Sequence, residues 1–349
     1  GLPLQLAFSL PLANNLVLLF SYVSSAFGVF LLVLYLLHAP KIKFSRPLVA
    51  YLAATAAGAV YAFSASRMMY VALGHYNFVT IQWFPYYTLF LLKTLRQGRP
   101  KAAVLTGLFA ALCLCAELTF GVFLLFITLF IFVDAWYRKM ASLTTLLIRL
   151  VPAGAVALGL TAPFILAVLP DFIDPAYNEP GWGEGLKLSA DLVGLVTLTP
   201  LHPLVGTDWI TELRAVIEGT SRFSDANTLF LGYAILAVAI GGFIAFRKVT
   251  AVWFWSAVIF TILSLGPLLT INGQNRFNLD GLEVTFPLPF ALLHYVPILS
   301  ANRVPNRFGI PLTLSLAILV GYGLVWLLNL LALRRGEKRA SSAPQPGLV

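Results

Sequence analysis

The sequence predicts an all-α polytopic membrane protein with about nine transmembrane helices and two structured outer loops. Three observations favour this fold class. The chain of 349 residues is 59% hydrophobic and 11% charged, with a mean hydropathy of +0.87, and a soluble domain could not bury that much apolar surface. It contains a succession of long apolar runs, and about 20 apolar residues suffice to cross a bilayer. Its charged residues are also sorted by position along the chain.

Basic residues cluster in short segments between the apolar runs, and acidic residues gather elsewhere. Most of the 23 Lys and Arg lie in five clusters: Lys41, Lys43 and Arg46; Lys93, Arg96, Arg99 and Lys101; Arg138, Lys139 and Arg149; Arg247 and Lys248; Arg334, Arg335, Lys338 and Arg339. Most of the 14 Asp and Glu fall within residues 170–228 and 269–307. Cytoplasmic loops are enriched in Lys and Arg. The clusters therefore predict the cytoplasmic side, and the two acidic segments predict outer loops.

The net charge of +9 does not indicate nucleic-acid binding. The basic residues sit at predicted helix ends rather than on one continuous face, so we interpret them as topology signals that also contact anionic lipid headgroups. We expect no nucleic-acid partner. The two cysteines, Cys113 and Cys115, lie two residues apart inside an apolar run and therefore on different helix faces. We expect them to be reduced packing residues, without a disulfide or a metal site.

The apolar runs give the order of the spanning helices. We expect them near residues 14–38, 48–64, 77–95, 102–116, 119–135, 146–169, 228–246, 250–268 and 308–333. The run from Ala102 to Val133 would be about 48 Å long as one straight helix. It has basic clusters at both ends, which a single crossing would place on opposite sides of the membrane. We therefore predict two short helices that turn near Glu117–Gly121.

The predicted organisation is one transmembrane helical domain over residues 1–339, followed by a flexible tail at 340–349 that is rich in Ser, Pro and Ala. Nine crossings with Lys41 inside would place Gly1 outside. Residues 1–13 lack the positively charged start of a signal peptide. We therefore expect at least one helix and an outer loop to precede Gly1.

Both outer loops are expected to be structured. In loop 170–228, Ile210, Leu213 and Ile217 share one helical face, which predicts a helix lying on the membrane surface. In loop 269–307, Asn272-Gly273 and Asp280-Gly281 between apolar residues predict a small hairpin system. The apolar stretch 288–299 that follows is expected to dip into the membrane interface.

Several polar residues fall at the predicted outer ends of the helices. Arg67, His75, Asn77 and Gln82 surround the second outer turn. Glu117 is the most deeply placed carboxylate, and ionisable groups at membrane depth are costly and usually face a cavity or a partner. Glu117 is therefore a candidate for a substrate site. The alternative is that it caps a helix hairpin and meets water.

A second candidate is Asn302-Arg303-Val-Pro-Asn306-Arg307-Phe, just before the last helix. Two guanidinium groups four residues apart could clamp a phosphate at the outer headgroup level, and Arg67 would add to this anion site. The alternative is that Arg303 and Arg307 bind lipid phosphates or pair with loop carboxylates.

Metal chemistry is not indicated by the histidines. His75, His202 and His294 are all predicted outside, but their spacing forms no ligand motif. A divalent cation is the one cofactor that stays open. The acids of the first outer loop are weak candidates for a general base: Asp171, Asp174, Glu179, Glu184 and Asp191. The chain contains no Gly-rich phosphate loop, nucleophile elbow or zinc helix motif.

Five short segments together resemble a known family. They are Pro11-Leu-Ala-Asn-Asn15, Gly74-His75-Tyr-Asn77, Gln82-Trp83-Phe-Pro85, Glu117-Leu-Thr-Phe-Gly121, and Leu288-Pro289 leading to Arg303-Val-Pro-Asn-Arg307-Phe. In this succession the chain resembles bacterial integral-membrane glycosyltransferases of the GT-C type.

The resemblance implies a GT-C-like helical bundle in the bacterial plasma (inner) membrane, with a catalytic cleft on the outer side. The implied partners are a sugar donor linked to polyprenyl phosphate, membrane lipids, and a glycan, lipid or protein acceptor. Arg303 and Arg307 would stabilise the leaving phosphate, and Glu117, His75 and Gln82 would line the cleft. Family members carry an essential Asp or Glu in the first outer loop. The expected catalytic base therefore lies upstream of Gly1, which leaves open whether the present residues catalyse the reaction by themselves.

Two other classes stay open. A transporter or lipid flippase would need ionisable or broken-helix features near the membrane midplane, and apart from Glu117 the predicted spans carry almost none. A structural subunit of a larger membrane assembly would need no catalytic residues.

Overall fold

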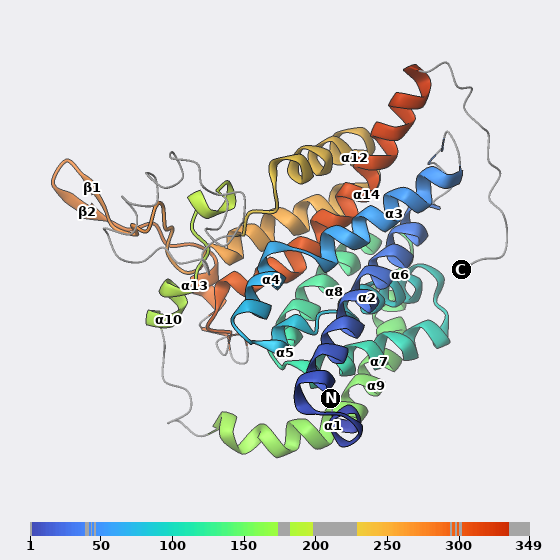
Figure 1. Ribbon diagram of the computed structural model, residues 1–349, viewed down its shortest axis with the longest axis horizontal. Helices are drawn as coiled ribbons and strands as arrows, with labels where there is room; N and C mark the ends of the chain where they lie inside the picture. The colour runs from blue at the N-terminus through green and yellow to red at the C-terminus, as the bar shows by residue number, and fades with distance from the viewer. Residues whose placement is uncertain are drawn as a thin grey trace. The chain divides into compact units, whose positions relative to one another are not determined.

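The computed structural model describes residues 2–38, 42, 44, 47–173, 182–197, 229–293, 295–296, 299 and 302–334, and most of them are helical (Figure 1). Within these ranges, six helical stretches are long and apolar enough to cross a membrane: Leu10–Leu37, Pro47–Ala72, Phe120–Tyr137, Leu143–Pro170, Tyr233–Ser264 and Pro305–Leu333. The helical fold and a multi-pass membrane character therefore agree with the sequence. Nine crossings stay a prediction.

The elements follow in this order. The helices are α1 (Leu2–Ala7), α2 (Leu10–Leu37), α3 (Pro47–Ala62), α4 (Ala65–Ala72), α5 (Tyr76–Val79), α6 (Trp83–Gln97), α7 (Pro100–Ala116), α8 (Phe120–Tyr137), α9 (Leu143–Ile173), α10 (Trp182–Lys187), α12 (Tyr233–Ser264), α13 (Phe290–Leu293) and α14 (Gly309–Arg334). Two 3-10 turns are η1 (Val193–Leu195) and η4 (Pro305–Phe308), and the strands are β1 (Phe277–Leu279) and β2 (Leu282–Val284).

The helix predicted near 77–95 begins later than expected. The short α5 comes first, and α6 starts at Trp83. The physical reason is Pro85, whose ring would clash with the carbonyl of Ile81 if the helix already ran through both residues. In the first turn of α6 the missing N–H of Pro85 costs nothing.

The turn between α7 and α8 confirms the predicted break near Glu117–Gly121. Helix α7 ends at Ala116, Glu117 takes an extended conformation, and α8 begins at Phe120. The two helices contact each other directly. Residues 100–137 are therefore a helical hairpin rather than one long helix.

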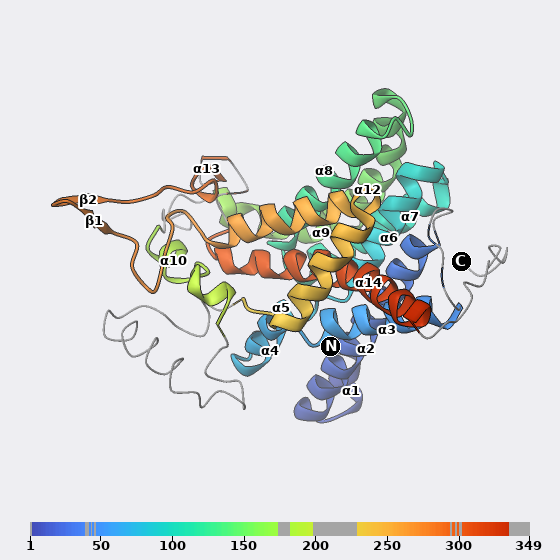
Figure 2. The same ribbon diagram turned by 90° about the horizontal axis from the view of Figure 1, so that it is seen from above.

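Helix α12 contains the break that was predicted between 228–246 and 250–268. Phe246 has non-helical torsions (φ −124°, ψ 28°) immediately before Arg247 and Lys248. The rings of Phe243 and Phe254 stack with their centroids 3.9 Å apart. Eleven residues of straight helix would separate them by about 16 Å. The chain therefore folds back at Phe246, and Figures 1 and 2 show the two arms of α12. The first arm begins at Tyr233, after Gly232 at φ +105°.

The described chain divides into two compact units. The described residues of unit 1 fall within 1–165, 237–254 and 313–349, and those of unit 2 within 166–236 and 255–312. In unit 1, α2 packs against α3 and α6, and α6 packs against α7 and α8. Hydroxyl groups join α6 to α7 and to α8. The hydroxyl oxygens of Thr94 and Thr106 lie 3.1 Å apart, and those of Tyr87 and Thr128 lie 2.5 Å apart. These contacts fix α6, the helix whose first residues reach the candidate site.

Unit 2 contains the predicted hairpin. Strands β1 and β2 pair antiparallel around Asp280-Gly281, and both turn residues have positive φ. Asn272 and Gly273 form a second turn of the same kind, closed by a bridge between Ile271 and Gln274. Asn-Gly and Asp-Gly favour such turns because they tolerate positive φ. The predicted surface helix over residues 209–217 lies outside the described residues, and α13 is the described helix of the apolar stretch 288–299.

Candidate functional site

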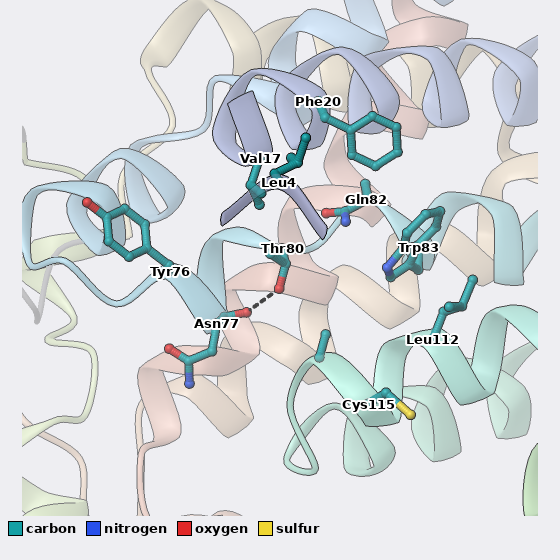
Figure 3. A pocket seen from close by; sticks show the side chains of 11 residues that line it. Leu4, Val17, Phe20, Tyr76, Asn77, Thr80, Gln82, Trp83, Leu112 and Cys115 are labelled. Atoms are coloured by element: carbon teal, nitrogen blue, oxygen red, sulfur yellow. Dashed lines mark hydrogen bonds between the residues drawn. The ribbon is translucent and has the colours of Figure 1, made fainter. Parts of the chain in front are cut away.

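A pocket of about 510 Å³ lies in unit 1 (Figure 3). Its lining comes from α1, α2, α5, the start of α6 and the end of α7: Leu4, Val17, Phe20, Tyr76, Asn77, Thr80, Gln82, Trp83, Leu112, Cys115 and Ala116. In Figure 3 the α2 side chains lie on one side and those of α7 on the other, with Thr80, Gln82 and Trp83 between them. The pocket therefore opens where several helices end.

Gln82 is held from behind by a buried polar network. The side chain of Arg67 is 1% exposed, and its Nη2 donates to the hydroxyl of Ser21 at 2.6 Å. The Ser21 hydroxyl lies 2.5 Å from Oε1 of Gln82. Arg67 also donates through Nε to the carbonyl of Val79 and through Nη1 to the carbonyl of Ala62, both at 3.1 Å. The guanidinium thus ties the end of α3 and the end of α5 to α2.

Asn77 is held by Glu117 at the turn between α7 and α8. Nδ2 of Asn77 donates to Oε2 of Glu117 at 2.6 Å. The other carboxylate oxygen accepts a hydrogen bond from the hydroxyl of Thr119 at 2.9 Å. Glu117 therefore links α5 to the helical hairpin and supports the start of α8.

The rest of the lining is largely apolar. The ring of Trp83 contacts Phe20 and Phe109, with centroids 6.1 Å and 6.0 Å apart. Thr80 donates its hydroxyl proton to the carbonyl of Asn77 at 2.6 Å, as the dashed line in Figure 3 shows. Cys115 is a free, exposed thiol. Apolar walls with a few fixed polar groups are the usual composition of a small-molecule site.

The structure brings together three of the six predicted substrate-binding residues. Gln82 lines the pocket, Glu117 bonds Asn77 in its wall, and His75 directly precedes the lining residue Tyr76. The ring of His75 is exposed and stacks on Tyr70 at 6.2 Å. Arg67 supports this group from the protein interior, because its buried guanidinium is directed at backbone carbonyls and Ser21.

Arg303 and Arg307 belong to unit 2. Arg307 lies in η4, which is tied to the chain after α10 by a bond from the Asn306 amide to the carbonyl of Leu188 at 3.1 Å. Both arginine side chains are partly exposed. Their role as a phosphate clamp stays a prediction.

Sequence reasoning did not place Ser21, Thr80 or Cys115 at the site. Ser21 sits within an apolar helix, where a serine gives no signal by itself. Cys115 was expected to be a packing residue like Cys113, which is buried. A finer signal existed, because Cys115 lies two residues before Glu117 and therefore close to the predicted outer turn.

Asp191 ties the two predicted outer loops together. Its side chain is 1% exposed and accepts hydrogen bonds from the amides of Val193 (2.8 Å), Asn272 (3.1 Å) and Gly273 (2.9 Å). With both oxygens occupied in this way, Asp191 has a structural role rather than that of the general base considered above. The side chains of Asp171, Asp174, Glu179 and Glu184 lie outside the described residues.

Within the described ranges, no group of three or more His, Cys, Asp or Glu could hold a metal ion. His202 and His294 are not among the described residues.

Comparison with known proteins does not identify the chain: no family model, no curated protein and no solved structure matches it.

Proposed function

We propose that this chain is a membrane glycosyltransferase that takes a sugar from a polyprenyl-phosphate carrier at the outer ends of its helices, in the bacterial inner membrane. The observation that carries this proposal is the lining of the pocket. Amide and hydroxyl groups of Asn77, Thr80 and Gln82 lie beside the apolar side chains of α2 and α7. Such a lining suits an amphipathic ligand with a polar head next to a lipid chain.

The chemistry requires a base and an anion site. A carboxylate would remove the proton from the acceptor hydroxyl, which attacks the anomeric carbon as the lipid phosphate leaves. Both oxygens of Glu117 already accept hydrogen bonds, so we assign it to positioning rather than to proton removal. Arg303 and Arg307 are our candidates for binding the phosphate.

The same state of Glu117 favours one alternative. The carboxylate that bonds the pocket wall is engaged by Asn77 and Thr119. A non-catalytic subunit of a membrane assembly needs no free base. A Glu117 whose two oxygens both accept hydrogen bonds is compatible with that role.

The test is sugar transfer by the full-length protein in lipid nanodiscs. The probes are polyprenyl phosphates carrying radiolabelled glucose, galactose, mannose or arabinose, each assayed with Mg²⁺ and with EDTA. We expect one donor to be consumed, by transfer or by slow hydrolysis. If none of the four is turned over, the non-catalytic alternative replaces this proposal.

The phosphate role is tested separately by Arg303→Ala. Removing a guanidinium that stabilises the leaving phosphate should lower turnover about 10²-fold or more. The matched control is Arg276→Ala, because Arg276 is an exposed arginine of the same unit, paired with Glu283 at 3.6 Å. Equal turnover in both variants would remove Arg303 from the site.

A further inference from the structure

Two carboxamides line the pocket, and each is held from outside the pocket by a charged residue. Gln82 is bonded to the chain Arg67–Ser21, and Asn77 is bonded to Glu117. A carboxamide can present either its oxygen or its nitrogen, and the two cannot be told apart by shape. The charged residues decide which of the two each amide presents to the pocket.

For Gln82 the deciding group is the guanidinium of Arg67. Arginine is always protonated and only donates, so the Ser21 hydroxyl accepts from Nη2 and passes its own proton onward. The Ser21 hydroxyl has two acceptors within reach, Oε1 of Gln82 at 2.5 Å and the backbone carbonyl of Val79 at 3.1 Å. The Val79 carbonyl already accepts from Arg67 Nε and from the amide of Ile81, so the Ser21 proton goes to the nearer Gln82. Oε1 of Gln82 is therefore bound to Ser21, and Nε2 is left to donate to a ligand.

For Asn77 the deciding group is the carboxylate of Glu117. An ionised carboxylate only accepts, so the Asn77 atom 2.6 Å from it is the amide nitrogen. Oδ1 of Asn77 is thereby left to accept from a ligand. Thr80 also presents an acceptor, because its hydroxyl proton is donated to the backbone carbonyl of Asn77 and its oxygen can then only accept.

We propose that this pocket recognises a neutral group that bears hydroxyls, such as a sugar ring or another polyol, with Gln82 Nε2 as donor and Asn77 Oδ1 as acceptor. A hydroxyl both donates and accepts, so it satisfies both amides. The diester phosphate that joins a sugar to a polyprenyl chain has only acceptor oxygens, which Asn77 Oδ1, Thr80 and the nearby Glu117 carboxylate disfavour. This inference rests on the proposed function only in taking the pocket as the substrate site. It assigns the pocket to the sugar rather than to the phosphate.

The two charged residues are then positioning residues. Arg67 acts through Ser21 on Gln82, and Glu117 acts directly on Asn77. Their opposite charges give the two amides opposite orientations. The pocket consequently has a donor and an acceptor in fixed places before any ligand binds.

Cys115 provides a probe inside the site. It lines the pocket and is exposed, whereas Cys113 is buried. The experiment measures the rate at which N-ethylmaleimide alkylates Cys115 in the full-length protein in nanodiscs, by mass spectrometry of the peptide that contains it. Octyl β-glucoside and octyl phosphate, both below their micellar concentrations, compete. They share one alkyl chain and differ only in the head group.

We expect octyl glucoside to slow the alkylation of Cys115 in a saturable manner. Octyl phosphate at the same concentration should protect at least about threefold less, because one neutral hydrogen bond is worth a factor of about two to ten in affinity. Equal protection by the two head groups would overturn the proposal, as would no protection by the glucoside.

The variant Gln82→Glu removes the donor but keeps the oxygen that Ser21 binds. It should raise the half-protecting concentration of octyl glucoside about three- to tenfold. Gln97→Glu is the matched control, because Gln97 ends the same helix and is bonded to Tyr35. Identical protection in Gln82→Glu and Gln97→Glu would contradict the role of Gln82.

The positioning role of Glu117 is read from head-group preference. In Glu117→Gln the new amide can donate or accept, so Asn77 is no longer held in one orientation. With each alkylation rate taken relative to the same variant's rate without competitor, the ratio of glucoside to phosphate protection should fall about threefold. Glu117→Asp, which still only accepts, should retain the ratio. An unchanged ratio in Glu117→Gln would reject this role.

The outcomes separate this inference from the proposed function. Selective protection by octyl glucoside without any sugar transfer would support the proposed specificity of the pocket and reject the glycosyltransferase activity. Sugar transfer combined with equal protection by both head groups would support the enzyme and reject the proposed specificity of the pocket.

Discussion

The guanidinium of Arg67 satisfies acceptors that helix geometry leaves open. Helix α3 ends at Ala62, and the carbonyl of Ala62 accepts from Arg67 Nη1 instead of from a following helical amide. The ring of Tyr22 lies 4.0 Å from the guanidinium carbon, a cation–π contact. The sequence placed Arg67 at an outer turn and suggested an anion site. Only the three-dimensional path of the chain shows that its partners are the protein's own carbonyls and Ser21.

Replacing Arg67 tests this structural role. In Arg67→Met, the Ala62 carbonyl and the Ser21 hydroxyl lose their donor inside the protein, and the Val79 carbonyl keeps only its bond from the Ile81 amide among these backbone donors. The free energy of unfolding should fall by roughly 2–4 kcal/mol, because buried acceptors left without partners are costly. It can be measured by denaturant titration in mixed micelles. Arg99→Met is the control, since Arg99 is exposed at the start of α7, and a similar loss in both variants would argue against the network.

Asp191→Asn tests the carboxylate that joins the two outer loops. An NH2 group replaces one of the two carboxylate oxygens, and it cannot accept the hydrogen bond that Oδ2 accepts from the Gly273 amide. Hydrogen exchange at Asn272 and Gly273 should become about 5- to 100-fold faster, which corresponds to roughly 1–3 kcal/mol. Asp280→Asn should leave exchange unchanged, because Asp280 is exposed in the β1–β2 turn and Asn tolerates its positive φ. Slow exchange at Gly273 in Asp191→Asn would contradict the assignment.

Among the elements, the breaks that the sequence predicted have clear local causes. The turn at Glu117 was predicted from length and from the basic clusters, and the turn at Phe246 from the basic pair Arg247-Lys248 between two apolar runs. Both are present. The start of α6 was wrong because the apolar pattern continues through residues 77–82, whereas Pro85 forbids the helix there. Apolar periodicity locates a helix well, and its ends depend on single residues.

Close packing of α12 and α14 depends on glycine. A Cβ atom added at Gly242 would lie 2.4 Å from the carbonyl oxygen of Leu319 and 2.5 Å from the amide nitrogen of Gly323. Small residues allow helix backbones to approach in this way within a membrane.

Gly242→Ala should therefore destabilise the fold by about 1–3 kcal/mol, since backbone atoms cannot move aside. Gly154→Ala in α9 is the same substitution at a position where nothing lies within 4 Å. It should be neutral or slightly stabilising because alanine favours helices by up to about 1 kcal/mol. Thermal unfolding of the two variants in the same detergent measures the difference. Equal melting temperatures would show that α12 and α14 are not closely packed.

For the whole molecule, exposed apolar surface favours a membrane setting. Only 11% of the residues in an apolar 18-residue window of α9 are buried inside the protein. In the corresponding window of α12, 17% of the residues are buried. Helices with so much exposed apolar surface would aggregate in water, whereas lipid chains solvate them. Of the candidate residues that the sequence singled out, Gln82 lines the pocket, and Glu117 bonds the lining residue Asn77. The sequence could not predict the pairing of Asn77 with Glu117 or of Gln82 with Ser21, because these pairs join helices far apart along the chain.

The proposed function requires that the end of α7 carrying Cys115 and the pocket face the outside, and that the end carrying Arg99 face the cytoplasm. The most direct measurement labels intact cells with a membrane-impermeant sulfonated maleimide. We expect the native thiol of Cys115 to react in intact cells. In a Cys115→Ser background, Arg99→Cys should react only after permeabilisation, because Arg99 begins α7 and Cys115 is near its end. If the thiol at position 99 reacts in intact cells and Cys115 does not, the orientation is inverted and the outer-face pocket is lost with it.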